Sequence, residues 1–377
     1  GRLSMTKAAE LAKMGEVLDN SQIGGRRNII INGAMQVAQR STSETGVFDA
    51  SQYETLDRFK INGSTSGRAT MTQTADGPSG FANCLKLACT TADTSIAAGE
   101  FGIIRYLIEG QDLQQIKKGT SDAEKVTISF YVKGNANATY QLEFKDGDNN
   151  RVNAQTFNVT TSWNRIILTF DADTTGAFDD DNAASVQLNF WLHAGSTYTS
   201  GTFTSNTWAS GTDANRVNSS NTSFFDSTDR TFFLTGLQME IGSVATPFEF
   251  RSYGEERQLC YRYYYRTPDS VAGGHGANET FPCVGNMDGT QTGAFMFIFP
   301  VPMRAAPTAI EQSGTATDYS IRVTSDSNGT SVPSAGGFTS EKALVNLVSS
   351  GAGQTSGNGA FMRMEDTDAF IAFSAEL

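Results

Sequence analysis

The sequence is poor in positive charge and has no long hydrophobic run. Its 377 residues contain 28 Lys and Arg against 40 Asp and Glu, a formal net charge of −12. Proteins that follow a nucleic-acid backbone need clustered Lys and Arg, so this balance argues against nucleic-acid binding. The longest mostly apolar run, residues 294–303, contains two prolines and is too short to span a bilayer, so no membrane insertion is expected.

The sequence also has few residues for metal or nucleophilic chemistry, with two histidines and four cysteines. The cysteines show no zinc spacing and are expected to be free, buried thiols, as in a reducing cytosol: Cys84, Cys89, Cys260 and Cys283. Walker A, GxSxG and HExxH motifs are absent, which favours a protein that is not an enzyme and needs no cofactor. A pair of carboxylates for glycoside hydrolysis has no spacing signature, so a glycan depolymerase stays an alternative.

One helix is predicted, over residues 4–18, where Leu11, Met14 and Leu18 form an apolar stripe. So short a helix is marginal alone in water, so residues 1–25 are candidates for attachment or oligomerisation. A packed N-terminal helix without that role is the alternative.

From residue 28 onward the apolar period changes to two, and Gly-, Asn- and Asp-rich turns separate the segments. This pattern predicts a mainly β protein with a sandwich or barrel over residues 26–251.

A second, smaller β domain is predicted over residues 252–377, after a short charged helical turn and a Tyr-rich strand. Within the first domain, residues 194–223 form a long Ser-, Thr-, Asn- and Gly-rich stretch. Loops of this length inside a compact domain are usually functional or mobile. Trp208 lies in this stretch, as either a ligand contact or an anchor of the loop.

Alternation along three strands predicts which side chains point outward. One face should form the core: Val126, Ile128, Phe130, Val132, Tyr140, Leu142, Phe144, Val186, Leu188, Phe190 and Leu192. If the strands are neighbours, the other face carries Tyr131, Gln141, Glu143, Asn189 and Trp191. Exposed rings among amides and a carboxylate are typical of a sugar-binding face. The alternative is that the second domain or a neighbouring subunit covers Trp191.

Several motifs together resemble tailed-bacteriophage tail-fibre and tail-appendage proteins. They are RRNIIINGAMQVAQRST (residues 26–42), YETLDRFKI (53–61), LTGLQMEIGSVATPFEFRSYGEERQLCYRYY (234–264) and FPVPMRAAPTAI (299–310). The resemblance implies a jelly-roll β-sandwich similar to carbohydrate-binding modules over residues 26–251. It also implies a homotrimeric virion protein, assembled in the host cytoplasm, that contacts other tail proteins and binds a host-surface glycan during adsorption.

The resemblance leaves two questions open. A structural adaptor or decoration protein without a ligand is the alternative to a receptor-binding fibre. In the similar fold a structural Ca²⁺ often lies between the N-terminal and last strands, which here implies a site near Asn32, Gln36 and Glu240. Acidic turns such as residues 179–181 are solvated by default, although their hard oxygen ligands also suit Ca²⁺.

Overall fold

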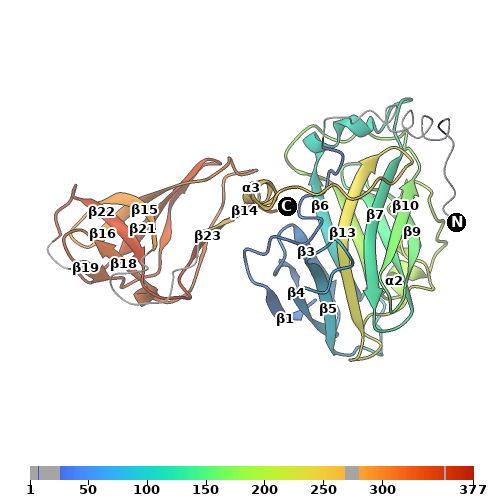
Figure 1. The fold of residues 1–377 in the computed structure, drawn as a ribbon, viewed down its shortest axis with the longest axis horizontal. Helices are drawn as coiled ribbons and strands as arrows, with labels where there is room; N and C mark the ends of the chain where they lie inside the picture. The colour runs from blue at the N-terminus through green and yellow to red at the C-terminus, as the bar shows by residue number, and fades with distance from the viewer. Residues whose placement is uncertain (1–6, 8–25, 268–279, 352–353) are drawn as a thin grey trace. The chain divides into compact units, whose positions relative to one another are not determined.

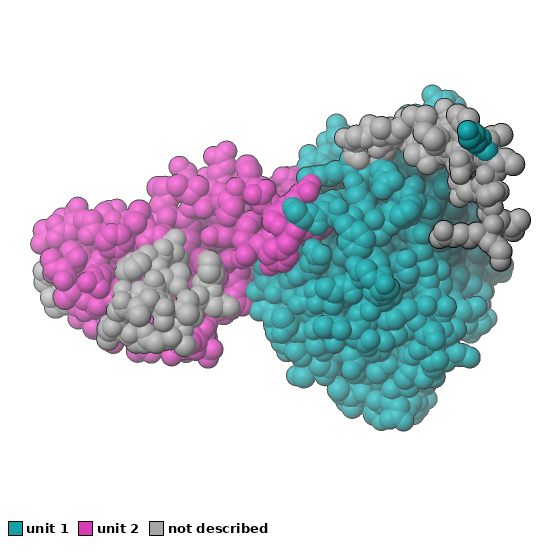
Figure 2. Space-filling view, viewed as in Figure 1, with its two compact units in different colours: residues 1–252 teal, residues 253–377 magenta. Residues whose placement is uncertain are grey.

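The segments with a period of two form four antiparallel sheets in the computed structural model of the protein (Figure 1). The structure describes Lys7 and residues 26–267, 280–351 and 354–377. Apart from Lys7, the helix predicted over residues 4–18 lies outside the described residues. The chain divides into two compact units, residues 1–252 and 253–377, coloured separately in Figure 2. The division lies one residue from the boundary expected between residues 251 and 252.

Unit 1 is a β-sandwich of two sheets, as predicted. The six-stranded sheet has the order β1 (Ser43–Val47), β4 (Arg68–Thr74), β5 (Cys84–Thr91), β13 (Thr231–Ile241), β7 (Val126–Gly134) and β10 (Asn164–Phe170). The seven-stranded sheet has the order β12 (Ala209–Ser210), β9 (Arg151–Val159), β8 (Ala138–Asp146), β11 (Ala184–Ala194), β6 (Phe101–Glu109), β3 (Phe59–Ser64) and β2 (Ser51–Tyr53). The chain crosses repeatedly between the two sheets, whereas β2–β3, β4–β5, β8–β9 and β11–β12 each follow one another within one sheet.

Aromatic rings from both sheets fill the core of unit 1. Phe130 of β7 packs edge-on against Phe190 of β11, with 5.1 Å between ring centroids, and against Phe157 of β9 at the same distance. The core faces read from the alternation are confirmed, because every predicted residue on them is buried. Such edge-to-face pairs add to the free energy gained by removing the rings from water.

Residues 28–31, where the period of two begins and predicts a strand, do not form one. Asn28 inserts its side chain beside β13, where Oδ1 accepts hydrogen bonds from the backbone N–H of Ile30 (3.0 Å) and Met239 (3.1 Å). Its backbone N–H donates to the carboxylate of Glu249 (2.6 Å). Side-chain bonds therefore replace the regular backbone ladder beside the C-terminal half of β13, which β5 leaves unpaired.

Unit 2 is a second β-sandwich. Its three-stranded sheet has the order β14 (Tyr264–Arg266), β23 (Ile371–Ser374) and β17 (Ile310–Gln312). Its seven-stranded sheet has the order β19 (Asp326–Asn328), β18 (Tyr319–Arg322), β22 (Gly359–Met364), β15 (Thr280–Met287), β16 (Thr292–Ile298), β21 (Lys342–Val348) and β20 (Ser334–Phe338). Phe373 of β23 packs on Phe297 of β16 at 5.4 Å, which joins the two layers.

The helical segments within residues 26–267, 280–351 and 354–377 are short and lie outside the sheets. They are α2 (Ser196–Thr199), α3 (Tyr253–Tyr261) and the 3-10 turns η1 (Gly110–Asp112), η2 (Gln114–Ile116), η3 (Asp213–Asn215) and η4 (Ala316–Asp318). None of the helices in the described part of the chain combines the length and the apolar character needed to span a bilayer. The four cysteines are buried and free, which confirms the prediction made from their spacing.

Candidate functional site on the seven-stranded sheet of unit 1

The outer face of the seven-stranded sheet in unit 1 carries a row of polar and aromatic side chains. The row crosses five strands through direct cross-strand partners: Tyr53, Lys60, Arg105, Asn189 and Glu143. Directly opposed side chains on one sheet face lie about 4.5–5.5 Å apart at Cβ, so neighbours in the row can contact each other. Gln187 and Lys145 are cross-strand partners in the adjacent row of the same face.

The residues of this face fall into two parts, which we name by their exposure. The closed part contains Gln141, Glu143, Asn189 and Trp191, each at most 1% exposed. The open part contains partly exposed side chains: Tyr53, Lys60, Arg105, Lys145 and Gln187. The two parts meet where Nε of Arg105 donates to Oδ1 of Asn189 (2.8 Å).

Glu143 is the centre of the closed part. Arg216 donates to its carboxylate through Nε and Nη2, both at 2.8 Å, in a bidentate fork. Asn189 Nδ2 (2.8 Å) and Trp191 Nε1 (3.2 Å) donate to the same group. Burial by itself raises the pKa of Glu143, but the hydrogen bonds and charge of Arg216, together with the amide and indole bonds, hold that pKa below its ordinary value. Glu143 is therefore ionised and fully bonded.

The long polar loop covers the closed part. The guanidinium of Arg216 lies 4.9 Å from the ring centroid of Trp191, and the ring of Tyr198 lies 5.2 Å from it. Gln141 binds the loop backbone at both ends of its amide, donating to the carbonyl of Arg216 (2.6 Å) and accepting from the N–H of Asn218 (2.9 Å). These bonds attach residues 195–218 to the sheet.

The prediction of an exposed face at Trp191, Asn189, Gln141 and Glu143 is therefore wrong, although the structure brings these four side chains together. The sequence analysis considered the second domain or a neighbouring subunit as the cover. In the structure, the loop of the same unit covers these side chains. Tyr131 is not part of this cluster, because β7 belongs to the six-stranded sheet, where its ring packs against Phe81 at 5.2 Å.

Trp208 anchors the covering loop. Its Nε1 donates to the carbonyl of Asp171 (2.6 Å), and its ring packs edge-on against Phe144 of the core at 5.2 Å. The Nζ of Lys118 lies 5.4 Å from the Trp208 ring centroid. Of the two roles considered for Trp208, these contacts favour the anchor of the loop.

The open part concentrates positive charge in an acidic protein. Burial lowers the pKa of Arg105. The charge of Glu143 raises this pKa, the charge of Arg216 lowers it, and the net shift is downward. Burial also lowers the pKa of Lys145, and the positive charge of Arg216 lowers it further. Lys145 has no hydrogen bond or ion pair among the described residues, and Arg105 donates to the neutral amide of Asn189. Both groups would bind an anion more strongly than a fully solvated cation does.

Tyr53 forms the aromatic edge of the open part. The Nζ of Lys60 lies 5.2 Å from its ring centroid, and the guanidinium of Arg40 lies 5.3 Å from it. Sequence reasoning missed Tyr53, Lys60, Arg105 and Lys145. The alternation of Ile104, Tyr106 and Ile108 on β6 is a signal that places Arg105 on the outer face, whereas Arg216 lies in an irregular loop and has no such signal.

The residues implied for calcium have partners of their own. Asn32 has a positive φ of 60° and bonds with its side chain to the backbone of Val37 and Asp57. The carboxylate of Glu240 accepts from Nε2 of Gln238 (2.8 Å) and from the N–H of Thr246 (3.1 Å). Gln36 is partly exposed. The calcium site near these residues stays a prediction.

The solved structures named below resemble this chain at low sequence identity. No family model and no curated protein matches the chain. A CBM4 structure is 13% identical, covering 56% of this chain and 97% of that one, with a TM-score of 0.30. A family 11 carbohydrate-binding module from Clostridium thermocellum is 11% identical, covering 55% of this chain and 99% of that one, with a TM-score of 0.28. A domain of tailspike protein 4 from bacteriophage CBA120 is 13% identical over 57% of this chain and 21% of its own, with a TM-score of 0.28.

Proposed function

We propose that unit 1 binds a glycan on the open part of its seven-stranded sheet. The observation that carries the proposal is the row of partly exposed side chains Tyr53, Lys60 and Arg105. Gln187 and Lys145 extend this surface in the adjacent row, beside the fully hydrogen-bonded closed part. Charged and amide groups can bond to sugar hydroxyls, and an aromatic ring can stack on a sugar C–H face. The bonds of Arg105 and Arg216 hold this surface in place before a ligand arrives.

The charge of the open part favours an acidic saccharide. The net charge of −12 offers no general attraction to an anionic ligand. Locally, however, Lys60, Arg105 and Lys145 lie on one face, and the adjacent carboxylate of Glu143 is compensated by Arg216. A carboxylate or phosphate on the sugar would form charge-assisted hydrogen bonds with these groups, which are stronger than those between neutral partners.

The proposed role is that of a virion tail fibre that binds host-surface glycan during adsorption without cleaving it. The tail-fibre motifs of residues 26–61 and 234–264 support the virion role. Glycoside hydrolysis commonly needs two carboxylates beside the bond. On the described face Glu143 is held in a bidentate ion pair, which supports binding without hydrolysis. A purified chain that released reducing ends from the bound polysaccharide would contradict this.

An exposed apolar row on the seven-stranded sheet of unit 2 supports self-association, and we propose the homotrimer that the tail-fibre resemblance implies. Cross-strand partners join Phe361, Val284, Met296 and Leu344, which are 45%, 62%, 47% and 38% exposed, and Ile298 on β16 is 75% exposed. Contiguous exposed apolar patches mark protein interaction sites. We propose that further copies of the chain cover this row. An adaptor whose row contacts a different virion protein is the second candidate, because the same row would serve it.

Replacing two residues of the apolar row tests the trimer. The variant Met296→Lys with Ile298→Lys should sediment as a monomer, whereas the unaltered chain should sediment as a trimer. Val244→Lys is the matched control, since Val244 is an exposed apolar residue of unit 1 (39%). A monomeric unaltered chain would favour the adaptor instead.

Binding to a panel of neutral and acidic oligosaccharides tests the glycan site. The unaltered chain should bind saccharides bearing uronate or phosphate, and binding should weaken with added salt. Arg105→Ala and Lys145→Ala should each lower affinity about tenfold or more, as expected for a lost charge-assisted hydrogen bond. The matched control is Lys86→Ala, which removes a partly buried lysine from the six-stranded sheet. Unchanged binding in both folded variants would place the site elsewhere.

A further inference from the structure

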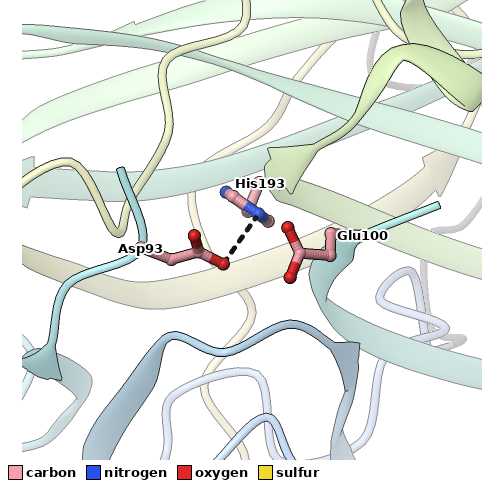
Figure 3. A group of neighbouring side chains, drawn as sticks. All are labelled: Asp93, Glu100 and His193. Atoms are coloured by element: carbon pink, nitrogen blue, oxygen red, sulfur yellow. Dashed lines mark ion pairs between the residues drawn. The ribbon is translucent and has the colours of Figure 1, made fainter. Parts of the chain in front are cut away.

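Three side chains of unit 1 that can ligate a metal converge at a point separate from the proposed glycan site. Asp93 follows β5, Glu100 precedes β6, and His193 lies near the end of β11. One ligand atom from each lies within 4.8 Å of the other two. Figure 3 shows the carboxylates and the imidazole pointing toward one another. Asp93 and His193 are buried, and Glu100 is partly exposed.

His193 directs an unpartnered nitrogen into this cluster. Its side chain is fully buried, and Nδ1 lies 2.8 Å from Oγ of Ser223. Nε2 has no hydrogen-bond partner among the described residues, and Oδ2 of Asp93 lies 4.0 Å away (Figure 3). A buried polar atom left without a partner destabilises the fold, so its presence here calls for a ligand.

The two carboxylates are held in place by neutral donors. Oδ2 of Asp93 accepts from Oγ1 of Thr65 (2.6 Å), and Glu100 accepts from the N–H of Ala97 (2.5 Å). Among the described residues neither forms an ion pair with Lys or Arg, and the imidazole of His193 is the nearest group that could carry positive charge. Two acids this close repel each other unless a cation lies between them.

We propose that Asp93, Glu100 and His193 bind a divalent transition-metal ion such as Zn²⁺ or Mn²⁺. One imidazole nitrogen with two carboxylate oxygens suits these ions, whereas Ca²⁺ and Mg²⁺ prefer oxygen ligands alone. Metal–ligand distances of about 2.0–2.2 Å require the ligand atoms to approach by roughly 1 Å, which side-chain rotation can supply. Thr65 and Ser223 then orient Asp93 and His193 from outside the site.

The ion would act as a structural clamp. It would join residues 93–100 to the end of β11, next to Gly195, where the covering loop begins. The backbone N–H of Gly195 already donates to the carbonyl of Glu100 (2.8 Å), so both sides of the site meet at the root of that loop. Metal binding should therefore stabilise unit 1 without any role in the recognition of sugar.

Zinc titration of the full chain after removal of metal by a chelator tests the site. The unaltered chain should bind one Zn²⁺ in this site, and its Tm should rise by several degrees at zinc about 100-fold above Kd. Glu100→Gln, at the partly exposed position, should lower zinc affinity at least tenfold while the metal-free protein keeps its Tm. Any rise in Tm with Ca²⁺ at the same concentration should be equal in the unaltered chain and in Glu100→Gln, because Ca²⁺ would not bind at this site.

His193→Gln should also lose zinc binding, and His275→Ala is the matched control because it removes the other histidine of the chain. Zinc-edge anomalous scattering from crystals of the unaltered chain locates the ion independently of any variant. The proposal is overturned if the unaltered chain binds no zinc, if Glu100→Gln and His193→Gln bind it normally, or if His275→Ala loses it. None of these outcomes depends on glycan binding, so the two proposals fail separately.

Discussion

The closed and open parts of one sheet face in unit 1 differ in how their charges are compensated. In the closed part, the carboxylate of Glu143 accepts four hydrogen bonds, two of them from Arg216. In the open part, Arg105 donates to a neutral amide and Lys145 has no hydrogen bond among the described residues. Fully bonded buried charges stabilise a single structure, whereas partly buried cations with weak partners are available to a ligand.

The largest effect is expected from breaking the ion pair of the closed part. Arg216→Ala leaves the carboxylate of Glu143 buried without its cation and should lower the free energy of unfolding by roughly 3–5 kcal/mol. Chemical denaturation of the purified chain measures the change. Arg230→Ala is the control, because its partner Asp226 is 39% exposed and such pairs contribute about 0–1 kcal/mol. Equal losses in the two variants would remove the distinction between a closed cluster and a surface pair.

Acid should weaken the closed part in a defined pH range. The pKa of Glu143 is lowered in the folded state from an ordinary value of 4.5, which it keeps in the unfolded chain. The stabilisation is therefore fully present above pH 4.5 and is lost as the pH falls through the lower, folded pKa. Denaturation curves between pH 3 and pH 6 should show this loss, and Glu143→Gln should show a smaller one. An identical pH dependence in Glu143→Gln would assign the acid response to other carboxylates.

The smallest effect on stability is expected in the open part. Lys145→Met removes a cation whose pKa burial lowers, and which has no partner to lose among the described residues. The free energy of unfolding should change by no more than about 0.5 kcal/mol, in either direction. Thermal and chemical denaturation check this, with Arg216→Ala measured in parallel. A loss comparable to that of Arg216→Ala would show that Lys145 holds the fold together.

Much of the architecture follows from local patterns. The alternation of Val186, Leu188 and Phe190 predicts one buried face because side chains on a strand point to opposite sides in turn, and all three residues are buried. The sandwich class follows from many such segments without intervening helices. The segment at residues 28–31 departs from this prediction because Asn28 bonds to β13 through its side chain, which an apolar pattern does not reveal.

The candidate site was predicted less well, because alternation tells which side of a strand a residue occupies and not what covers that side. Trp191 points outward from its sheet, as the alternation predicts, but Arg216 and Tyr198 of the following loop lie over it. Tyr131 also points outward, from the other sheet. Strand pairing and loop position arise from contacts between residues distant in the chain, which have no local period.

The β-rich class, the buried strand faces and the free thiols can be predicted from the sequence, since each follows from the period and chemistry of neighbouring residues. The tertiary structure alone decided that a self-covered cluster around Glu143 borders an open cationic face, and that Asp93, Glu100 and His193 meet at one point. These groups come from different strands and loops and interact through space. Their distances and burial, rather than their order in the chain, set their charges and partners.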